Sequence, residues 1–237
     1  MPTVGVIKPS TRPGRAEELV AILPREIQLE HDGCNIANGR RAELEQSFRD
    51  FEAKVATMAK LKVDLIHPAG VPFLLLGYQG ERDLVKKWED QHGIPVFTNG
   101  MSQVNALNAY GAKRVVAASY FADPEVTKGF AKYITEAGFE VLNIAGFKVP
   151  FPDVPKLPPP VIKEFLDSVY LPHKGEADAF YLIGPAWRAT LDMLDALEEE
   201  YGIPIIHHVP AQSWEIQRRL GFRQPFEGHG RLMREMP

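Results

Sequence analysis

The sequence has one cysteine, no strongly basic segment and no long apolar run. Because Cys34 is the only cysteine among 237 residues, an intramolecular disulfide is impossible. The formal net charge is −4, with acidic and basic residues interspersed, which argues against a nucleic-acid partner. The longest apolar runs, such as 71–76, are too short to span a bilayer. The chain begins with a strand-like segment that lacks the features of a signal peptide, so we expect a cytoplasmic protein without membrane contact.

Nucleotide-binding and common hydrolase motifs are also missing. The glycines do not form GxGxxG after a predicted strand, and GxxxxGK[ST] does not occur. GxSxG and HExxH are absent as well. These absences exclude most cofactor-dependent enzymes and standard hydrolases, so we expect no cofactor.

Short apolar segments alternate with longer segments of helical period. The clearest helix is predicted over 40–61, where apolar residues recur at spacings of three and four, and another over 187–201. Strands rich in Val and Ile, each followed by a helix, predict an α/β fold with parallel sheet and helices on both faces. The predicted strands are 3–7, 63–67, 95–98, 114–119, 139–144, 179–183 and 204–207.

Two parts of the chain resemble each other. Segments 64–68 and 93–97 correspond to 178–185 and 202–206, and a Gly-Ile-Pro precedes a predicted strand in each part. The repeat predicts two similar lobes, each with a parallel four-stranded sheet, although Gly-x-Pro before a strand is also common in unrelated α/β proteins. We expect an N-terminal lobe over 1–112, a C-terminal lobe over 113–210, and a C-terminal helix and tail over 211–237 that pack back onto the first lobe.

The expected site lies at the carboxyl ends of the strands, where open parallel sheets bind ligands. A pocket closed by two lobes would exclude water, which suits proton transfer and carbanion chemistry. The proline-rich stretch 149–160 contains six prolines and is predicted to be an irregular, rigid connection. The loops expected at the site are 8–15, 68–73, 119–123, 184–188 and 207–212.

Four segments carry a resemblance to a known family. They are GVIKPSTR at 5–12, GAKRVVAASY at 111–120, the stretch 194–214, and GHGRL at 228–232. In this order and at about this spacing, they resemble the maleate isomerase and arylmalonate decarboxylase branch of the aspartate/glutamate racemase superfamily, over nearly the whole chain. The resemblance implies a two-lobed fold with pseudo-twofold symmetry and a cofactor-independent isomerase or lyase.

The same resemblance points to missing cysteines. Members of the superfamily use one cysteine per lobe to move a proton, and the decarboxylases keep only the second, with glycine at the first position. The first position falls here at Gly70 and the second at Gly184 or Pro185. Since a low-pKa thiolate drives the family's chemistry, we expect this chain to work without it. Cys34 matches neither position and is expected to be incidental.

Histidines are the candidates to replace the thiols. His207 and His208 occupy the place of a Ser-Ser pair at the end of the last strand, and His67 ends the corresponding strand of the other lobe. Imidazole suits acid/base work near neutral pH, and alternation along a strand means that one of His207 and His208 faces the cleft. The alternatives are histidines that are hydrogen-bonded within the structure, or a metal site built from all three.

The substrate is expected to carry a carboxylate. Tyr120 matches the family's tyrosine that donates to the substrate carboxylate. Arg12 and Arg188 could form bidentate contacts with a carboxylate, and Trp187 could form an apolar wall. Val71 and Pro72 replace the family's Thr-Ser oxyanion donors. The predicted binding residues are Pro9, Ser10, Arg12, Gly70, Val71, Pro72, Gly184, Pro185, Ala186, Trp187 and Arg188.

The leading hypothesis is an isomerase or decarboxylase-like lyase that acts on a small carboxylic acid through a carbanion or enolate, with Tyr120, His207, His208 and His67 as the catalytic candidates. Two alternatives stay open. One is a metal-assisted lyase or hydrolase that uses the three histidines as ligands, and the other is a non-catalytic binder of small carboxylates. A homodimer is also left open.

Overall fold

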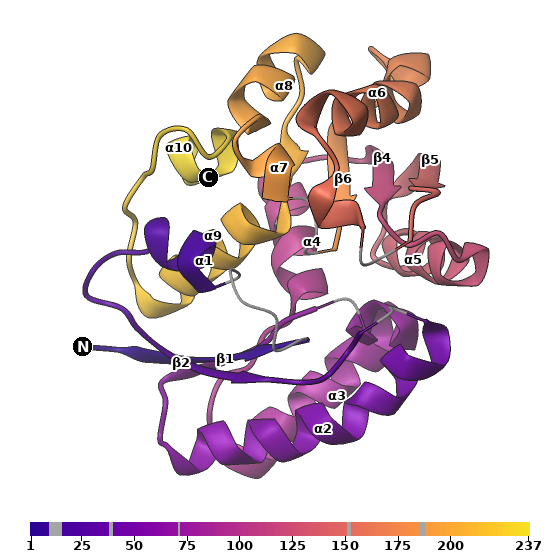
Figure 1. Ribbon diagram of the computed structural model, residues 1–237. Helices are drawn as coiled ribbons and strands as arrows, with labels where there is room; N and C mark the ends of the chain where they lie inside the picture. The colour runs from indigo at the N-terminus through magenta and orange to yellow at the C-terminus, as the bar shows by residue number, and fades with distance from the viewer. Residues whose placement is uncertain (10–15, 38–39, 71, 151–152, 185–187) are drawn as a thin grey trace.

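Two parallel β-sheets organise the computed structural model, which describes the chain except for residues 10–15, 38–39, 71, 151–152 and 185–187 (Figure 1). The first sheet has the order β2-β1-β3 and the second the order β5-β4-β6-β7. This arrangement confirms the predicted α/β fold with parallel sheets flanked by helices. The strands are β1 Thr3–Lys8, β2 Gln28–Gly33, β3 Leu65–Pro68, β4 Arg114–Ser119, β5 Glu140–Gly146, β6 Ala179–Ile183 and β7 Ile205–Ile206.

Helices cover both sheets and connect their strands. The α-helices are α1 Ala16–Ala21, α2 Arg41–Lys60, α3 Gly77–His92, α4 Asn99–Ala109, α5 Pro124–Glu136, α6 Pro159–Tyr170, α7 Arg188–Leu191, α8 Leu194–Tyr201, α9 His208–Leu220 and α10 Arg231–Glu235. Short 3-10 helices span Pro72–Leu76, Val154–Lys156 and Leu171–His173.

The first sheet has three strands, so the prediction of two four-stranded sheets is wrong. The predicted strand 95–98 joins β3 only through an isolated parallel bridge between Ile66 and Val96. Pro95 accepts a hydrogen bond from the Ile66 amide but has no N–H of its own to extend the pairing. Thr98 already caps α4, where its side chain accepts the Met101 amide. The segment between them is therefore too short to continue the ladder.

Two other sequence-based expectations also differ from the structure. The predicted helix 187–201 is divided into α7 and α8. The prolines at 159 and 160 open α6, because the first helical turn needs no intrahelical N–H donors there. The prediction that the whole stretch 149–160 is irregular is wrong at its C-terminal end.

Equivalent contacts recur in the two halves of the chain. Glu89 of α3 and Glu198 of α8 each accept the backbone amide seven residues later, at 2.8 Å, from Val96 and Ile205. Each of these helices ends at a glycine with positive φ, Gly93 or Gly202. The repeated Gly-Ile-Pro therefore has the same local structure in both halves. The glycine ends the helix, and a glutamate of that helix accepts a backbone amide of the segment that follows.

The helices α4 and α9 lie between the two sheets (Figure 1). Each helix follows one sheet in the sequence but also packs against the other sheet. The helix α4 follows the first sheet, yet the Gln103 amide donates to the carbonyls of Leu182 and Ile206 near the second sheet, at 2.8 and 3.1 Å. The helix α9 follows the second sheet, yet Ile216 belongs to the core around the first. Ser213 of α9 also donates to the Ile22 carbonyl. This exchange brings the N-termini of α4 and α9 together.

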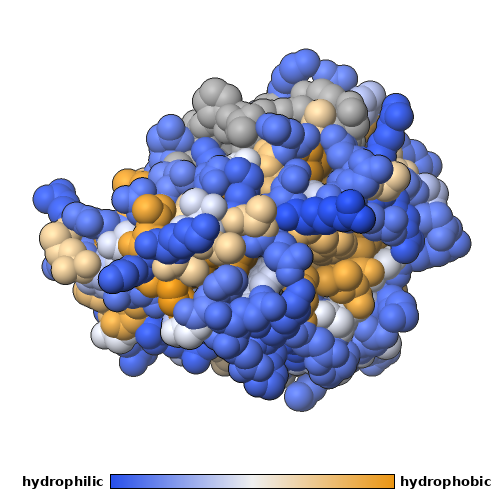
Figure 2. Space-filling view, turned by 90° about the horizontal axis from the view of Figure 1, so that it is seen from below, coloured by the Kyte–Doolittle hydropathy of each residue, from blue (hydrophilic) through white to orange (hydrophobic). Residues whose placement is uncertain are grey.

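The face below α2 and α3 is mainly hydrophilic, with scattered apolar side chains (Figure 2). None of the described helices is long and apolar enough to cross a bilayer.

Candidate active site

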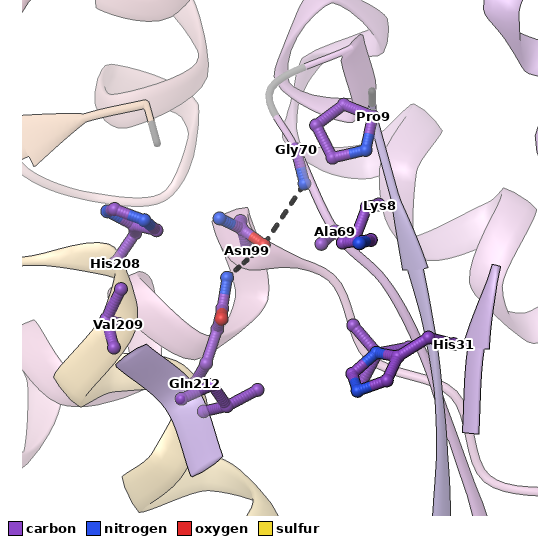
Figure 3. A pocket seen from close by; sticks show the side chains of 11 residues that line it. Lys8, Pro9, His31, Ala69, Gly70, Asn99, His208, Val209 and Gln212 are labelled. Carbon is purple, nitrogen blue, oxygen red and sulfur yellow. Dashed lines mark hydrogen bonds between the residues drawn. The ribbon is translucent and has the colours of Figure 1, made fainter. Parts of the chain in front are cut away.

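A small pocket lies where β1 and β3 end and where α4 and α9 begin (Figure 3). Its enclosed volume is about 30 Å³. This enclosed part has room for a group of a few atoms, such as one carboxylate. The position agrees with the rule that parallel sheets bind ligands beyond the carboxyl ends of their strands. The lining residues are Val6, Lys8, Pro9, Leu19, His31, Ala69, Gly70, Asn99, His208, Val209 and Gln212.

Asn99 lies at the centre of the polar wall (Figure 3). Its Oδ1 accepts the Gly70 amide at 3.2 Å and the Gln212 Nε2 at 3.0 Å. Asn99 is the first residue of α4, directly after the Thr98 cap, while Gln212 lies on α9. One side chain therefore joins the loop after β3 to the helix that carries His208.

The two adjacent histidines have different positions. His207 is the N-cap of α9, and its Nδ1 accepts the Val209 amide at 3.2 Å. His208 lines the pocket and is 4% exposed, with its ring 4.5 Å from that of His207. His207 is therefore engaged in capping the helix. His208 is the member of the pair that a bound ligand could contact.

His67 is fully buried behind the pocket. Its Nδ1 lies 2.9 Å from the Phe97 carbonyl, and its ring stacks on the Phe97 ring at 4.2 Å. Burial lowers the pKa of His67 to about 4, so the imidazole is neutral near neutral pH. Among the described residues, no group of three His, Cys, Asp or Glu side chains is placed to hold a metal ion. His67, His207 and His208 therefore do not form the ligand set that the metal hypothesis requires.

Glycines occupy equivalent, tightly packed positions after β3 and β6. Gly70 has φ +118° and Gly184 has φ +103°, a region that side-chain-bearing residues rarely adopt. A Cβ on Gly70 would lie 3.0 Å from Pro9 Cβ, and a Cβ on Gly184 would lie 2.0 Å from Tyr120 Cε1. Gly184 thus leaves space for the Tyr120 ring, which is buried and stacked on Phe121.

The remaining predicted binding residues lie mainly outside the described part of the chain. Pro9 lines the pocket, and Pro72 is buried at the start of a 3-10 helix. Arg188 begins α7, and its side chain is not described. Residues Ser10, Arg12, Val71, Pro185, Ala186 and Trp187 fall outside the described residues.

Comparison with known proteins identifies the family. A family model described as arylmalonate decarboxylase matches residues 5–233. The chain belongs to the arylmalonate decarboxylase family. This membership confirms the predicted branch of the racemase superfamily, and with it an enzyme of the isomerase or decarboxylase type. No curated protein is significantly similar to the chain in sequence.

Solved structures share the fold across their whole length. A maleate cis-trans isomerase from Nocardia farcinica, in a cysteine-to-serine variant with a covalently bound succinylcysteine intermediate, has a TM-score of 0.87 and 19% identity, covering 99% of this chain and 98% of that one. The maleate isomerase Iso from Pseudomonas putida S16 gives 0.87 and 18%, covering 100% and 99%. An arylmalonate decarboxylase gives 0.79 and 20%, covering 98% and 99%. Identities this low establish the fold alone.

The thiol of this family member lies in the core. Cys34 is 1% exposed among the apolar residues around the first sheet, and it does not line the described pocket. Burial raises the pKa of Cys34 to about 12, so the thiol stays protonated near neutral pH.

Sequence reasoning did not single out several pocket residues. Lys8 and Gln212 fall within segments that were expected to be loops at the site, but their side chains were not picked out. Asn99 follows the predicted strand 95–98, so the strand-end rule could have found it. His31 lies on β2, a strand that was not predicted. Partial burial lowers the pKa of His31, and the nearby charge of Lys8 lowers it further.

Proposed function

We propose that this protein is a cofactor-independent isomerase or decarboxylase-like lyase that acts on a small carboxylic acid, with His208 as the proton-transfer group in place of a cysteine. The observation that carries the proposal is the position of His208. It lines the same pocket as Gly70, at the start of α9 and across the Asn99–Gln212 pair.

In the decarboxylation, the bond between the α-carbon and one carboxyl carbon breaks and carbon dioxide leaves. The electron pair of that bond stays on the α-carbon, where the remaining carboxylate delocalises it as an enediolate. The His208 imidazolium then donates its proton to the α-carbon, and water later returns a proton to the imidazole. An isomerase would use the same imidazole to remove a proton from the α-carbon and would then reprotonate the delocalised anion on its other face or at another carbon.

The surroundings of the pocket suit a negatively charged intermediate. The helices α4 and α9 both begin there, and the N-terminal end of a helix dipole favours a nearby anion. Lys8 adds a positive charge to the wall, and no acidic side chain is among the described lining residues. We place one substrate carboxylate in this pocket. The rest of the substrate would extend toward Tyr120 and the loops after Pro9 and Gly184.

Cys34 and the two tight glycines support a reaction without a thiolate. Cys34 is buried with a raised pKa, and a side chain at Gly184 would collide with Tyr120. Proton transfer must then come from a group that titrates near neutral pH and contacts the pocket. His208 contacts the pocket, and imidazole is the side-chain group best suited to general acid and base catalysis in proteins.

The proposal is tested by a proton NMR time course in D₂O. The panel contains aryl- and alkylmalonates, maleate, and hydroxy- and amino-dicarboxylates, each with and without EDTA. We expect product with deuterium at the α-carbon for at least one acid, unaffected by EDTA and lost in His208→Gln. The control is His173→Gln, at a histidine outside the pocket. The proposal would be contradicted if the wild-type enzyme turned over no acid of the panel or if chelation abolished turnover. Full turnover by a folded His208→Gln protein would also contradict it.

A further inference from the structure

The side chain of Gln103 connects α4 to the ends of two strands of the second sheet. Its Nε2 donates to the Leu182 carbonyl at 2.8 Å and to the Ile206 carbonyl at 3.1 Å. Gln103 is 1% exposed and both partners are fully buried, so bulk water cannot replace a lost donor here. Because a backbone carbonyl only accepts, the atom that contacts both must be the amide nitrogen, and the two contacts use both of its hydrogens.

The two carbonyls lie at the point where β6 and β7 separate. The described ladder between these strands ends at the pair of Tyr181 and Ile206. Leu182 lies one residue past this pair, whereas the chain past Ile206 enters α9 at its cap, His207. The Gln103 amide therefore bridges the two strands where their own pairing ends.

Each of these carbonyls lies two residues before a residue of the candidate site. Leu182 precedes Gly184, which packs tightly against the Tyr120 ring, and Ile206 precedes His208, which lines the pocket. Two residues of extended chain span at most about 7 Å. The positions of Gly184 and His208 therefore depend closely on where the two carbonyls are held.

The same face of α4 also contacts the other half of the site. Asn99 and Gln103 are four residues apart on this helix, so they lie on one face and about 6 Å apart along its axis. Asn99 Oδ1 accepts the Gly70 amide and the Gln212 side chain. One turn of α4 thus holds the loop after β3, and the next turn holds the ends of β6 and β7.

We infer that Gln103 is a positioning residue for this site: its amide holds the ends of β6 and β7 against α4 and so sets the distance of His208 from Gly70. A neutral amide suits this task because it offers two donors without burying a charge. Methionine at the same position would keep a similar shape but remove both donors from the buried carbonyls. The effect on turnover rests on the proposed function, whereas the hydrogen bonds do not.

The hydrogen bonds are tested first without any substrate, by NMR on the full chain. The side-chain NH₂ hydrogens of Gln103 should exchange with D₂O roughly a hundredfold more slowly than those of the exposed Gln79. Gln103→Met should shift the carbonyl carbons of Leu182 and Ile206, and the control Gln79→Met should leave both unchanged. Fast exchange at Gln103, or unshifted carbonyl carbons in a folded Gln103→Met protein, would overturn the inference. The exchange measurement decides the matter even if the variant does not fold.

The second test uses whichever acid of the panel is turned over. Gln103→Met should lower kcat about tenfold or more, with KM changed less than about threefold, because a displacement of about 1 Å can reduce turnover up to a hundredfold. Gln103→Asn keeps the amide on a side chain too short for both contacts, and it should lower kcat in the same way.

The matched control is Val104→Ala, at the next residue of α4. Val104 is fully buried but apolar, so it takes no part in these hydrogen bonds. Val104→Ala should lose folding stability through poorer packing and keep kcat within about twofold. An unchanged kcat in folded Gln103→Met, or an equal loss of kcat in Val104→Ala, would refute the positioning role. A silent panel would refute the proposed function but leave the exchange result standing.

Discussion

Replacement of Glu81 by glutamine should make the free energy of unfolding less dependent on pH. Glu81 lies on α3 and is 0% exposed. Thr98 donates to its Oε1 at 2.5 Å, and Tyr133 donates to its Oε2. Gly100 makes room for this contact, because a Cβ there would lie 2.7 Å from Oε1. Burial raises the pKa of Glu81 from 4.5 to about 7, against the opposing effect of the two hydroxyl donors.

The sign and size of the effect follow from proton linkage. Between pH 4.5 and pH 7 the folded state holds a proton on Glu81 that the unfolded state has released, so folding stability falls as the pH rises. Between about pH 5 and pH 8 the loss should be about 2.5 kcal/mol. A glutamine keeps the shape and does not titrate. Glu81→Gln should therefore gain about that much relative to the wild type over the same interval.

Urea unfolding of both proteins at about pH 5 and pH 8 measures this difference. Burial also raises the pKa of Glu198 to about 7 and lowers the pKa of His67. Both groups are present in both proteins, so their contributions to the pH dependence of stability cancel in the comparison. Glu52→Gln, at a half-exposed glutamate paired with Lys87, controls for the loss of one negative charge. If the stability difference between Glu81→Gln and the wild type varies by less than about 0.5 kcal/mol across the interval, the assignment of a protonated core carboxyl is refuted.

Three further predictions concern Gly184, Tyr120 and Cys34. Gly184→Ala should lower the free energy of unfolding by more than about 2 kcal/mol in urea titrations, because it adds a collision with Tyr120 to an unfavourable φ. Gly202→Ala has a positive φ but no neighbour within 4 Å, so it isolates the backbone cost, and equal losses would contradict the collision. Tyr120→Phe should abolish turnover while the melting temperature stays within a few degrees, and full activity would disprove its contact with the substrate. Cys34 should react with iodoacetamide at least about tenfold more slowly in the native protein than in urea, whereas equal rates would mean that the thiol is accessible.

The fold was predictable where apolar burial alone decides the local structure. The strand 114–119 was predicted with its observed bounds because every residue after Arg114 is buried. The strand β2 was missed because it is a polar, largely exposed edge strand, Gln-Leu-Glu-His-Asp-Gly, stabilised by pairing with β1 and not by its own hydrophobicity. For the segment 95–98 the error was the reverse, because a strand was predicted where none forms. It is buried and apolar enough for a strand, yet Pro95 and the Thr98 cap restrict its pairing to one bridge.

The sequence could predict only those residues of the candidate site whose position follows from the neighbouring residues in the chain. Pro9, Gly70 and His208 line the pocket, and all three were named from strand ends and from the family resemblance. His207 and His208 differ in position because His207 caps α9 and His208 is the first residue of that helix. The alternation of side chains along a strand does not predict this helix start. Asn99 gains its role from Gln212, 113 residues away, through the packing of α4 against α9. No local pattern encodes that pairing.

The exchanged packing of α4 and α9 explains why the pocket depends on the relative position of the two sheets. Asn99 begins a helix that Gln103 anchors near the second sheet, while His208 begins a helix that Ile216 and Ser213 anchor near the first. The pocket is therefore lined by groups whose helices contact both sheets. The Asn99–Gln212 hydrogen bond joins the two helices at that point. Substitutions along it should therefore reduce turnover well before they reduce folding stability, because the large apolar cores on either side stay intact.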